Sequence, residues 1–244
     1  MGENLTYKGS GVDYDSMDPF KKMAQLAAQE TNLNALHLGF QPLSWTRGES
    51  VYVTEKDGRF FGHVEEGLGT KNLVADAMYQ LTGKTYYDHI GQDTLAMIVN
   101  DMITLGILPV TVAMHLAVGS SDWFNNTDRS NDLINGWKKA CDISECIWGG
   151  GETPTLKDII VPGTSVISGS AFGASVEDII FDPINITAGD AIIFCQSSGI
   201  HANGLTLARK IAETLPNGYL TELPGGRSYG ETLLDPTHIY VPFI

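Results

Sequence analysis

The sequence predicts an α+β fold, with a mixed α/β N-terminal domain over residues 1–178 and the beginning of a second α/β domain over residues 188–244. Segments with strand-like and helix-like periodicity are interspersed along the chain. Hydrophobic residues make up 43% of the 244 residues and charged residues 18%, as in a globular protein that buries a core. Between residues 177 and 189 Asp, Pro, Asn and Thr prevail, which favours a domain boundary there.

In the first half of the chain, the apolar residues from 19 to about 28 recur with a helical period. Residues 51–54 and 60–64 indicate two strands of a hairpin, because Asp57-Gly58 between them favours a tight turn. A short helix is expected over residues 72–81.

The second half again mixes the two periodicities. The pattern predicts a strand over 108–118, a helix over 128–144, a short buried strand over 146–148, a tight glycine loop over 149–151, a strand over 164–176, an apolar buried strand over 191–195 and a helix over 205–215.

The charge balance is strongly acidic, with 15 Lys and Arg against 29 Asp and Glu and a net charge of -14. Nucleic acids and anionic membranes attract basic surfaces, so we expect neither as a partner. An anionic substrate would have to be held by local lysines, backbone amides or bridging metal ions, and abundant carboxylates suit metal ions.

The three cysteines, Cys141, Cys146 and Cys195, have no C-x-x-C spacing, so we expect neither a disulfide framework nor a zinc site. This usage is typical of a reducing cytoplasm. The N-terminus lacks a basic segment followed by an apolar run, so no signal peptide is expected. No apolar run reaches the roughly 18 residues that a membrane span requires.

The stretch Glu65-Glu66-Gly67-Leu68-Gly69-Thr70-Lys71 joins a predicted strand to a predicted helix. Such a turn can direct backbone N–H groups, a cation and an acidic metal ligand at one polyphosphate. It is not a Walker A loop, because the threonine precedes the lysine and one residue separates the glycines. The alternative interpretation is a Gly-rich turn with a surface lysine.

The predicted helix from Gly91 to Gly106 has an apolar back and a polar face. At about 100° per residue, Asn100 and Thr104 fall almost in line with Asp93, and Asp101 lies about 80° away on the same side. A solvated face usually carries long Lys and Glu side chains, whereas short oxygen-bearing side chains suit metal coordination. Both interpretations of this face stay open.

Two further segments combine bare backbone with polar groups. Residues 196–204, Gln-Ser-Ser-Gly-Ile-His-Ala-Asn-Gly, stand between a predicted strand and a helix, an arrangement typical of an anion site. His201 lies inside this turn, although a lone histidine is more often structural. Three glycines precede Glu152, where a tight loop is the simpler interpretation. The polar N-terminal segment suggests either a frayed end or a flap whose Lys8 closes over a phosphate.

Together these segments resemble the aminoimidazole ribonucleotide synthetase (phosphoribosylformylglycinamidine cyclo-ligase) family over nearly the whole chain. The first and last matching blocks are specific to the family, and the middle ones recur across its superfamily. The blocks are Tyr7-Lys8-x-x-Gly11-Val12-Asp13, Glu66-Gly67-Leu68-Gly69-Thr70-Lys71, Gly91-x-Asp93 with Ala96-Met97-x-Val99-Asn100-Asp101, Gly150-Gly151-Glu152-Thr153, Ser197-Ser198-Gly199-x-His201-x-Asn203-Gly204 and Leu234-x-Pro236-Thr237-x-Ile239-Tyr240-Val241.

The resemblance implies a cytoplasmic ligase of purine biosynthesis that uses ATP and Mg²⁺. ATP would phosphorylate the formyl amide oxygen of formylglycinamidine ribonucleotide, and ring closure would then give aminoimidazole ribonucleotide. It also implies a homodimer formed through the N-terminal sheet, with a phosphorylated ribonucleotide as small-molecule substrate. The implied site residues are Glu66, Asp93 and Asp101 for metal; Lys8, Gly67, Gly69, Thr70, Lys71, Asn100, Ser198, Gly199 and Asn203 for nucleotide binding; and Lys71, Glu152 and His201 for catalysis.

The chain departs from the family pattern in three places. Glu66 stands where the family usually has aspartate, which lengthens the carboxylate's reach by one methylene. Pro154-Thr155-Leu156 replaces Ala-Glu-Met, so the substrate side is expected to differ. The family continues for about another hundred residues, the size of a small domain, so we expect most of the second domain to be missing.

Two other functions remain open. The chain could belong to a related ATP-dependent phosphoryl-transfer enzyme with another acceptor, such as those that make selenophosphate, phosphorylate thiamine monophosphate or mature hydrogenases. A selenophosphate synthetase normally has a reactive Cys or selenocysteine near its N-terminus, and none of the three cysteines lies there. A non-catalytic nucleotide-binding protein would bind ATP without turnover.

Overall fold

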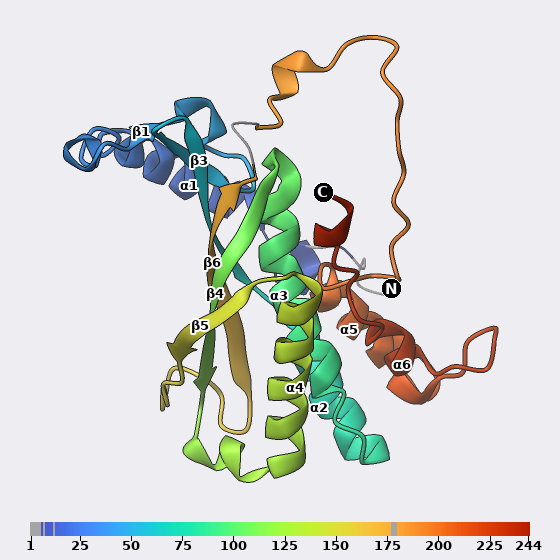
Figure 1. Cartoon of the computed structure of the whole chain (residues 1–244). Helices are drawn as coiled ribbons and strands as arrows, with labels where there is room; N and C mark the ends of the chain where they lie inside the picture. The colour runs from blue at the N-terminus through green and yellow to red at the C-terminus, as the bar shows by residue number, and fades with distance from the viewer. Residues whose placement is uncertain (1–5, 7, 12, 177–179) are drawn as a thin grey trace.

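The computed structural model describes residues 6, 8–11, 13–176 and 180–244. Its elements are arranged around one mixed sheet (Figure 1). Its six strands lie in the order β1-β2-β3-β6-β4-β5, and all neighbours are antiparallel except β4 and β5. The strands are β1 Gln41–Pro42, β2 Tyr52–Lys56, β3 Arg59–Gly67, β4 Ile107–Val118, β5 Ile147–Glu152 and β6 Ser165–Ser175. This architecture confirms the predicted mixed α/β fold.

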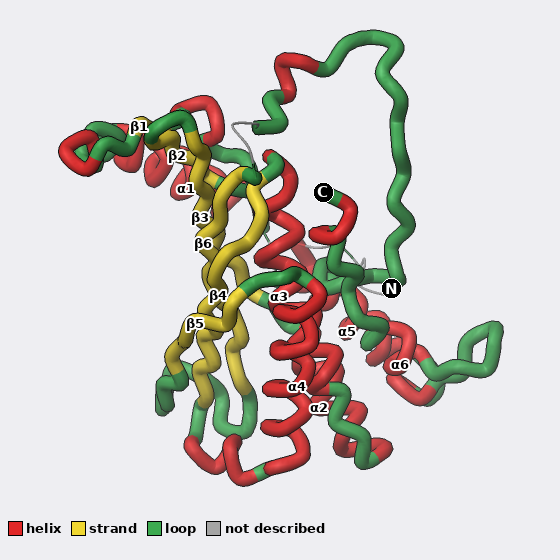
Figure 2. Tube along the Cα trace, in the orientation of Figure 1, coloured by secondary structure: helices red, strands yellow, loops and turns green. Residues whose placement is uncertain are grey.

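Helices cover one face of the sheet, as Figure 2 shows. Helices α3 and α4 pack on each other, and α3 also contacts β3, β4 and β6. Helix α4 makes the crossover between the parallel strands β4 and β5, as parallel pairing requires. The helices are α1 Tyr14–Gln29, α2 Lys71–Thr82, α3 Tyr87–Met102, α4 Thr127–Ile143, α5 Leu205–Thr214 and α6 Tyr229–Leu233.

The local predictions with strong periodicity are confirmed. Asp57 and Gly58 have φ angles of 53° and 80°, which give the tight turn between β2 and β3. Asn126 caps α4 by accepting a hydrogen bond from the N–H of Arg129. Strand β6 lies between β3 and β4, and its alternating burial matches the predicted packing against neighbours on both sides.

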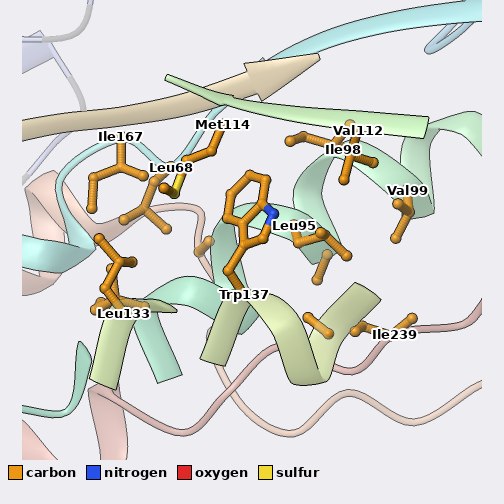
Figure 3. Packing of buried hydrophobic residues seen from close by; sticks show 14 of the residues in the cluster. Leu68, Leu95, Ile98, Val99, Val112, Met114, Leu133, Trp137, Ile167 and Ile239 are labelled. Carbon is orange, nitrogen blue, oxygen red and sulfur yellow. The ribbon is translucent and has the colours of Figure 1, made fainter. Parts of the chain in front are cut away.

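The core lies between the sheet and the pair α3–α4 (Figure 3). Trp137 of α4 is fully buried there and lies among Leu95, Ile98 and Met114 in Figure 3. The two helices approach closely, because a Cβ added to Gly136 would stand only 2.0 Å from the carbonyl oxygen of Asp88. A larger residue there would push the helices apart and disturb this core.

The predicted structure of residues 146–151 is wrong in two respects. The three glycines do not form a tight loop but belong to β5, which extends to Glu152. The strand is also not buried, since the side chain of Ile147 is 62% exposed. The physical reason is its position at the edge of the sheet, where only β4 pairs with it.

The predicted buried strand over 191–195 is also wrong. These residues form a loop, and Ile192, Ile193 and Phe194 are 97%, 86% and 88% exposed. A strand is stabilised by its neighbours, and none of the described strands pairs with this segment. The helix predicted after it is confirmed as α5. The domain boundary between residues 178 and 188 stays a prediction.

Candidate functional site

The polar face of α3 is covered by the C-terminal segment 234–240, which the sequence did not reveal. Asp93 Oδ1 accepts hydrogen bonds from the N–H and the hydroxyl of Thr237, at 2.7 and 2.6 Å. Seven residues further along α3, the side chain of Asn100 donates to the carbonyl of His238 at 2.8 Å and accepts from the N–H of Tyr240 at 2.9 Å. The face is therefore neither a solvated surface nor an open metal site along its whole length.

Lys71, the last residue of the Gly-rich stretch, points into the protein and not toward solvent. Its side chain is fully buried, and its Nζ lies 2.9 and 2.8 Å from the two carboxylate oxygens of Asp93. Nζ also donates to the carbonyl of Asp235 at 2.7 Å. Burial lowers the pKa of Lys71 and raises the pKa of Asp93, while their mutual attraction opposes both shifts. The pair ties α2, α3 and the C-terminal segment together.

Glu66 and Asp101 form a different electrostatic arrangement. Partial burial and the neighbouring charge of Glu66 together raise the pKa of Asp101 to about 6. A cation bound between two such carboxylates would relieve their repulsion, and carboxylate oxygens are ligands of Mg²⁺. Within the described ranges, no three or more His, Cys, Asp or Glu side chains gather as a metal cluster, so Asp93 does not join this pair.

One cavity of about 200 Å³ brings together two of the predicted phosphate-binding turns. Gly67, Gly69 and Thr70 line one side of it, and Asn203 lies on the other side with the first residues of α5. Gly204 caps α5 without a side-chain hydrogen bond, so the first N–H groups of this helix have no side-chain cap. Thr70 Oγ1 is buried and has no hydrogen-bond partner among the described residues.

The rest of the predicted turn 196–204 folds against the C-terminal segment. Ser198 donates its N–H to His201 Nε2 at 3.1 Å and its hydroxyl to the carbonyl of Pro236 at 2.6 Å. Burial, with the nearby His238 and Lys71, lowers the pKa of His201. In a neutral ring one nitrogen carries the proton, and the hydrogen bond from the Ser198 N–H requires the tautomer that has this proton on Nδ1 and leaves Nε2 as the acceptor.

Several predicted residues do not line this cavity, among them Lys8, Gly199 and Glu152. Lys8 is exposed and pairs with Asp13 and Asp15, although its 3₁₀ turn, Lys8–Ser10, lies against α5. Its neighbours Tyr7 and Val12 in the matching block lie outside the described residues. Gly199 does not line the cavity. Glu152 lines a second, more open cavity of about 370 Å³ on the sheet, together with Glu65 and His115.

Sequence reasoning missed several residues of the site. Tyr14, at the start of α1, lines the 200 Å³ cavity, and no pattern around it signals a binding role. Thr237 belongs to a block that was recognised, but its contact with Asp93 spans 144 positions of the chain. Gln92 and His89 bind the backbone carbonyls of Thr237 and Leu234. The sequence does not indicate which backbone carbonyl groups will accept such hydrogen bonds, because every residue has one.

Comparison with known proteins agrees with the matching blocks. The family model described as AIR synthase related protein, N-terminal domain, matches residues 66–174. Phosphoribosylformylglycinamidine cyclo-ligase from Carboxydothermus hydrogenoformans is 37% identical over 98% of this chain and 67% of its own length. The chloroplastic enzyme of that name from Arabidopsis thaliana is 34% identical over 98% of this chain and 55% of its own length.

A solved structure, AaThiL complexed with AMPPCP and TMP, is 17% identical and covers 52% of this chain and 36% of its own, with a TM-score of 0.42. That score is too low to support an inference about function. In the part of the chain that the structure describes, no helix has the length and apolarity needed to cross a bilayer.

The chain thus spans between 55% and 67% of the length of these two curated relatives, and nearly all of its own length aligns with them. The blocks that the alignment covers include both turns of the 200 Å³ cavity and the C-terminal segment on α3. This chain belongs to the phosphoribosylformylglycinamidine cyclo-ligase family.

Proposed function

We propose that this chain binds the ATP and Mg²⁺ of a cytoplasmic phosphoribosylformylglycinamidine cyclo-ligase. In the reaction, ATP phosphorylates the formyl amide oxygen of formylglycinamidine ribonucleotide. The neighbouring amine then attacks the same carbon, phosphate leaves, and the imidazole ring closes. The observation that carries the proposal is the single cavity lined by both the turn 67–70 and the start of α5.

This cavity offers what a polyphosphate needs in an acidic protein. Gly67 and Gly69 have no side chain to cover the backbone of this turn, and the N-terminus of α5 adds the positive end of a helix dipole. The buried hydroxyl of Thr70 lacks a partner in the described chain and could donate to a phosphate oxygen. Tyr14 lies on the cavity wall, where its ring could pack against a nucleotide base.

Glu66 and Asp101 fit a Mg²⁺ ion better than Asp93 does. Burial and the charge of Glu66 raise the pKa of Asp101, and a cation there would relieve the repulsion between the two carboxylates. Asp93 already has Lys71 and Thr237 as partners, so it would have to exchange one of them for a metal. A bound Mg²⁺ would neutralise phosphate charge during transfer.

The three predicted catalytic residues would lie at different distances from the transferred phosphate. They are Lys71, His201 and Glu152. Lys71 could reach a phosphate only by leaving Asp93, and otherwise it positions the N-terminus of α2 beside the cavity. His201 would hold the turn 196–204 in place through Ser198. Glu152 lies with His115 in the open cavity on the sheet, where it would face the ribonucleotide substrate.

The open face of the sheet supports a homodimer. Helices α3 and α4 cover the other face (Figure 1). Val166 and Phe172 of β6 lie on this one, because they alternate with buried residues of the strand, and they are 50% and 43% exposed. Phe172 stacks on Phe61 with ring centroids 5.9 Å apart, which forms an apolar centre for an interface. Light scattering should find a dimer, and Phe172→Asp should convert it to a monomer. A monomeric wild-type chain would remove dimerisation from the proposal.

Binding of ATP is tested by calorimetry with Gly69→Ala and Gly83→Ala. Both glycines have left-handed φ angles, 73° and 78°, and neither Cβ would meet an atom within 4 Å. The backbone strain is therefore matched at roughly 1–2 kcal/mol, but only Gly69 lines the cavity. We expect ATP affinity to fall about tenfold in Gly69→Ala only. Equal affinities in both variants would place the nucleotide elsewhere.

Turnover is tested separately, with formylglycinamidine ribonucleotide and ATP·Mg²⁺ supplied to the chain and to a full-length relative. We expect ADP release coupled to ring closure. ATP binding without ADP release in both proteins would favour the non-catalytic alternative. ADP release that requires a different acceptor would instead favour a related phosphoryl-transfer enzyme.

A further inference from the structure

The end of helix α4 places two cysteines in contact. The N–H of Cys146 donates to the carbonyl of Cys141 at 3.1 Å, and the N–H of Glu145 donates to the carbonyl of Asp142 at 3.3 Å. Glu145 has a φ of 51°, in the left-handed region. These three features define a Schellman cap, in which the residue two positions past the C-cap contacts the residue three positions before it. Here those two residues are Cys146 and Cys141.

The two thiols have unequal surroundings. Cys141 is 4% exposed, whereas Cys146 is only partly buried. The hydrogen bond from the Cys141 thiol lowers the pKa of Cys146 and correspondingly raises that of Cys141. Cys146 is thus the more accessible sulfur and the one that loses its proton more readily, and Cys141 is a sheltered thiol beside it. This is the arrangement of an attacking and a resolving cysteine.

We propose that Cys141 and Cys146 form a reversible dithiol–disulfide pair that reacts with hydroperoxides. The Cys146 thiolate attacks the terminal peroxide oxygen, the O–O bond breaks, and the alkoxide leaves as an alcohol after taking a proton. Cys146 is then a sulfenic acid. The Cys141 sulfur attacks it, the S–O bond breaks, and hydroxide leaves with the Cys141 proton as water. Two electrons pass from the two thiols to the peroxide, and an added dithiol then reduces the disulfide back to two thiols and is itself oxidised.

Formation of the disulfide would restrain strand β5. Cys146 directly precedes β5, and Trp148 in that strand lies 6.1 Å from Trp137 of α4 between ring centroids. A bond between Cys141 and Cys146 joins the end of α4 covalently to the start of this strand. Because Glu152 ends the same strand, the bond would also restrain one wall of the open cavity.

The experiment treats the whole chain with hydrogen peroxide, blocks the remaining thiols with N-ethylmaleimide, and digests with trypsin. Cleavage after Lys139 and Lys157 leaves both cysteines in one peptide, residues 140–157. We expect this peptide to lose two hydrogens and take up no maleimide, and dithiothreitol to restore two maleimide additions. Two additions at a peroxide dose that oxidises the exposed Cys195 would overturn the proposal.

Serine variants assign the two roles. In Cys141→Ser we expect a sulfenic acid at Cys146 that dimedone traps, and in Cys146→Ser no product in this peptide. Cys195→Ser is the control and should leave the disulfide unchanged. Far-UV circular dichroism verifies folding, and the wild-type digest decides the matter even if a variant unfolds. Dimedone on Cys141 in Cys146→Ser, or none on Cys146 in Cys141→Ser, would contradict the assigned order.

Discussion

Two aspartates on helix α3 lie in opposite electrostatic surroundings. Asp93 is fully buried and is surrounded by donors, the Lys71 ammonium and two groups of Thr237. Asp101, eight residues further on, is partly exposed, and the charge of a second carboxylate, Glu66, repels it. Both were expected in one metal site, yet one carboxylate is already neutralised and the other is not.

The difference indicates a division of labour along one helix. The Asp93 end connects α2, α3 and the C-terminal segment, so its charge is used to hold the structure together. The Asp101 end carries uncompensated negative charge that a cation would stabilise. Changes at the first end should therefore affect folding, and changes at the second should affect metal binding.

The largest effect should come from breaking the buried pair. Lys71→Met leaves the Asp93 charge buried, and we expect the free energy of unfolding to fall by about 3–5 kcal/mol. Urea denaturation followed by circular dichroism measures this loss. The double variant Lys71→Met/Asp93→Leu should recover a large part of it, because no unpaired charge remains.

The control is Lys138→Met, which breaks an exposed pair with Asp142 on α4. It should change the unfolding free energy by less than about 1 kcal/mol. If Lys71→Met were as mild as Lys138→Met, Asp93 would not depend on Lys71, and the contrast with Asp101 would lose its basis.

A smaller effect is expected from Thr237→Val, which removes the hydroxyl donor to Asp93 but keeps the backbone N–H. A hydrogen bond to a charged group contributes about 1.5–3 kcal/mol, so the unfolding free energy should fall by that amount. Hydrogen exchange should also speed up in residues 234–240. Thr232→Val, whose hydroxyl binds the carbonyl of Ser228 in α6, serves as the matched control. Equal protection of 234–240 in both variants would contradict a role of Thr237 in holding this segment.

The sequence predicted those parts of the fold that depend on local pattern. Periodicity was enough for the β2–β3 hairpin and for the existence of α3, α4 and α5, although α3 begins at Tyr87, before the predicted Gly91, and ends at Met102. They were not enough for residues 191–195, because an apolar run becomes a strand only beside another strand. The same limit applies to β5, whose burial depends on its edge position in the sheet.

The candidate site was predicted in outline for a similar reason. The short polar side chains on α3 left a choice between a solvated face and a metal site. The third possibility, a cover of backbone N–H and C=O groups from residues 234–240, could not be predicted, since every residue carries such groups. The cavity residues Gly67, Gly69 and Asn203 were found because glycine-rich turns are recognisable in a sequence.

The raised pKa of Asp101 predicts that the stability of the folded chain depends on pH. Asp101 titrates at about 6 in the folded chain against an ordinary value of 3.8, so the folded state binds more protons between these values. The contribution of Asp101 to stability should therefore decrease as pH rises from 4 to 6, the opposite of a salt-bridged aspartate. Glu66→Gln should lower the pKa of Asp101, although burial keeps part of the shift.

Carboxyl ¹³C NMR titration in a metal chelator measures this pKa. Glu65→Gln is the matched control, because neighbouring residues of β3 point to opposite faces of the sheet. A pKa that is equally lowered by both changes would show a general charge effect in place of a Glu66–Asp101 pair.

The smallest effect is expected from Glu66→Asp, which keeps the charge and shortens the side chain by one methylene. If Glu66 is a metal ligand, Mg²⁺ affinity should be kept or raised, with a change below about tenfold, or 1.4 kcal/mol. Glu66→Gln should weaken binding more, because Mg²⁺ prefers charged oxygen ligands in strict geometry. Calorimetry with an ATP analogue present measures both. Complete loss of Mg²⁺ binding in Glu66→Asp, with folding intact, would contradict the role of Glu66 as the metal ligand that replaces the family's aspartate.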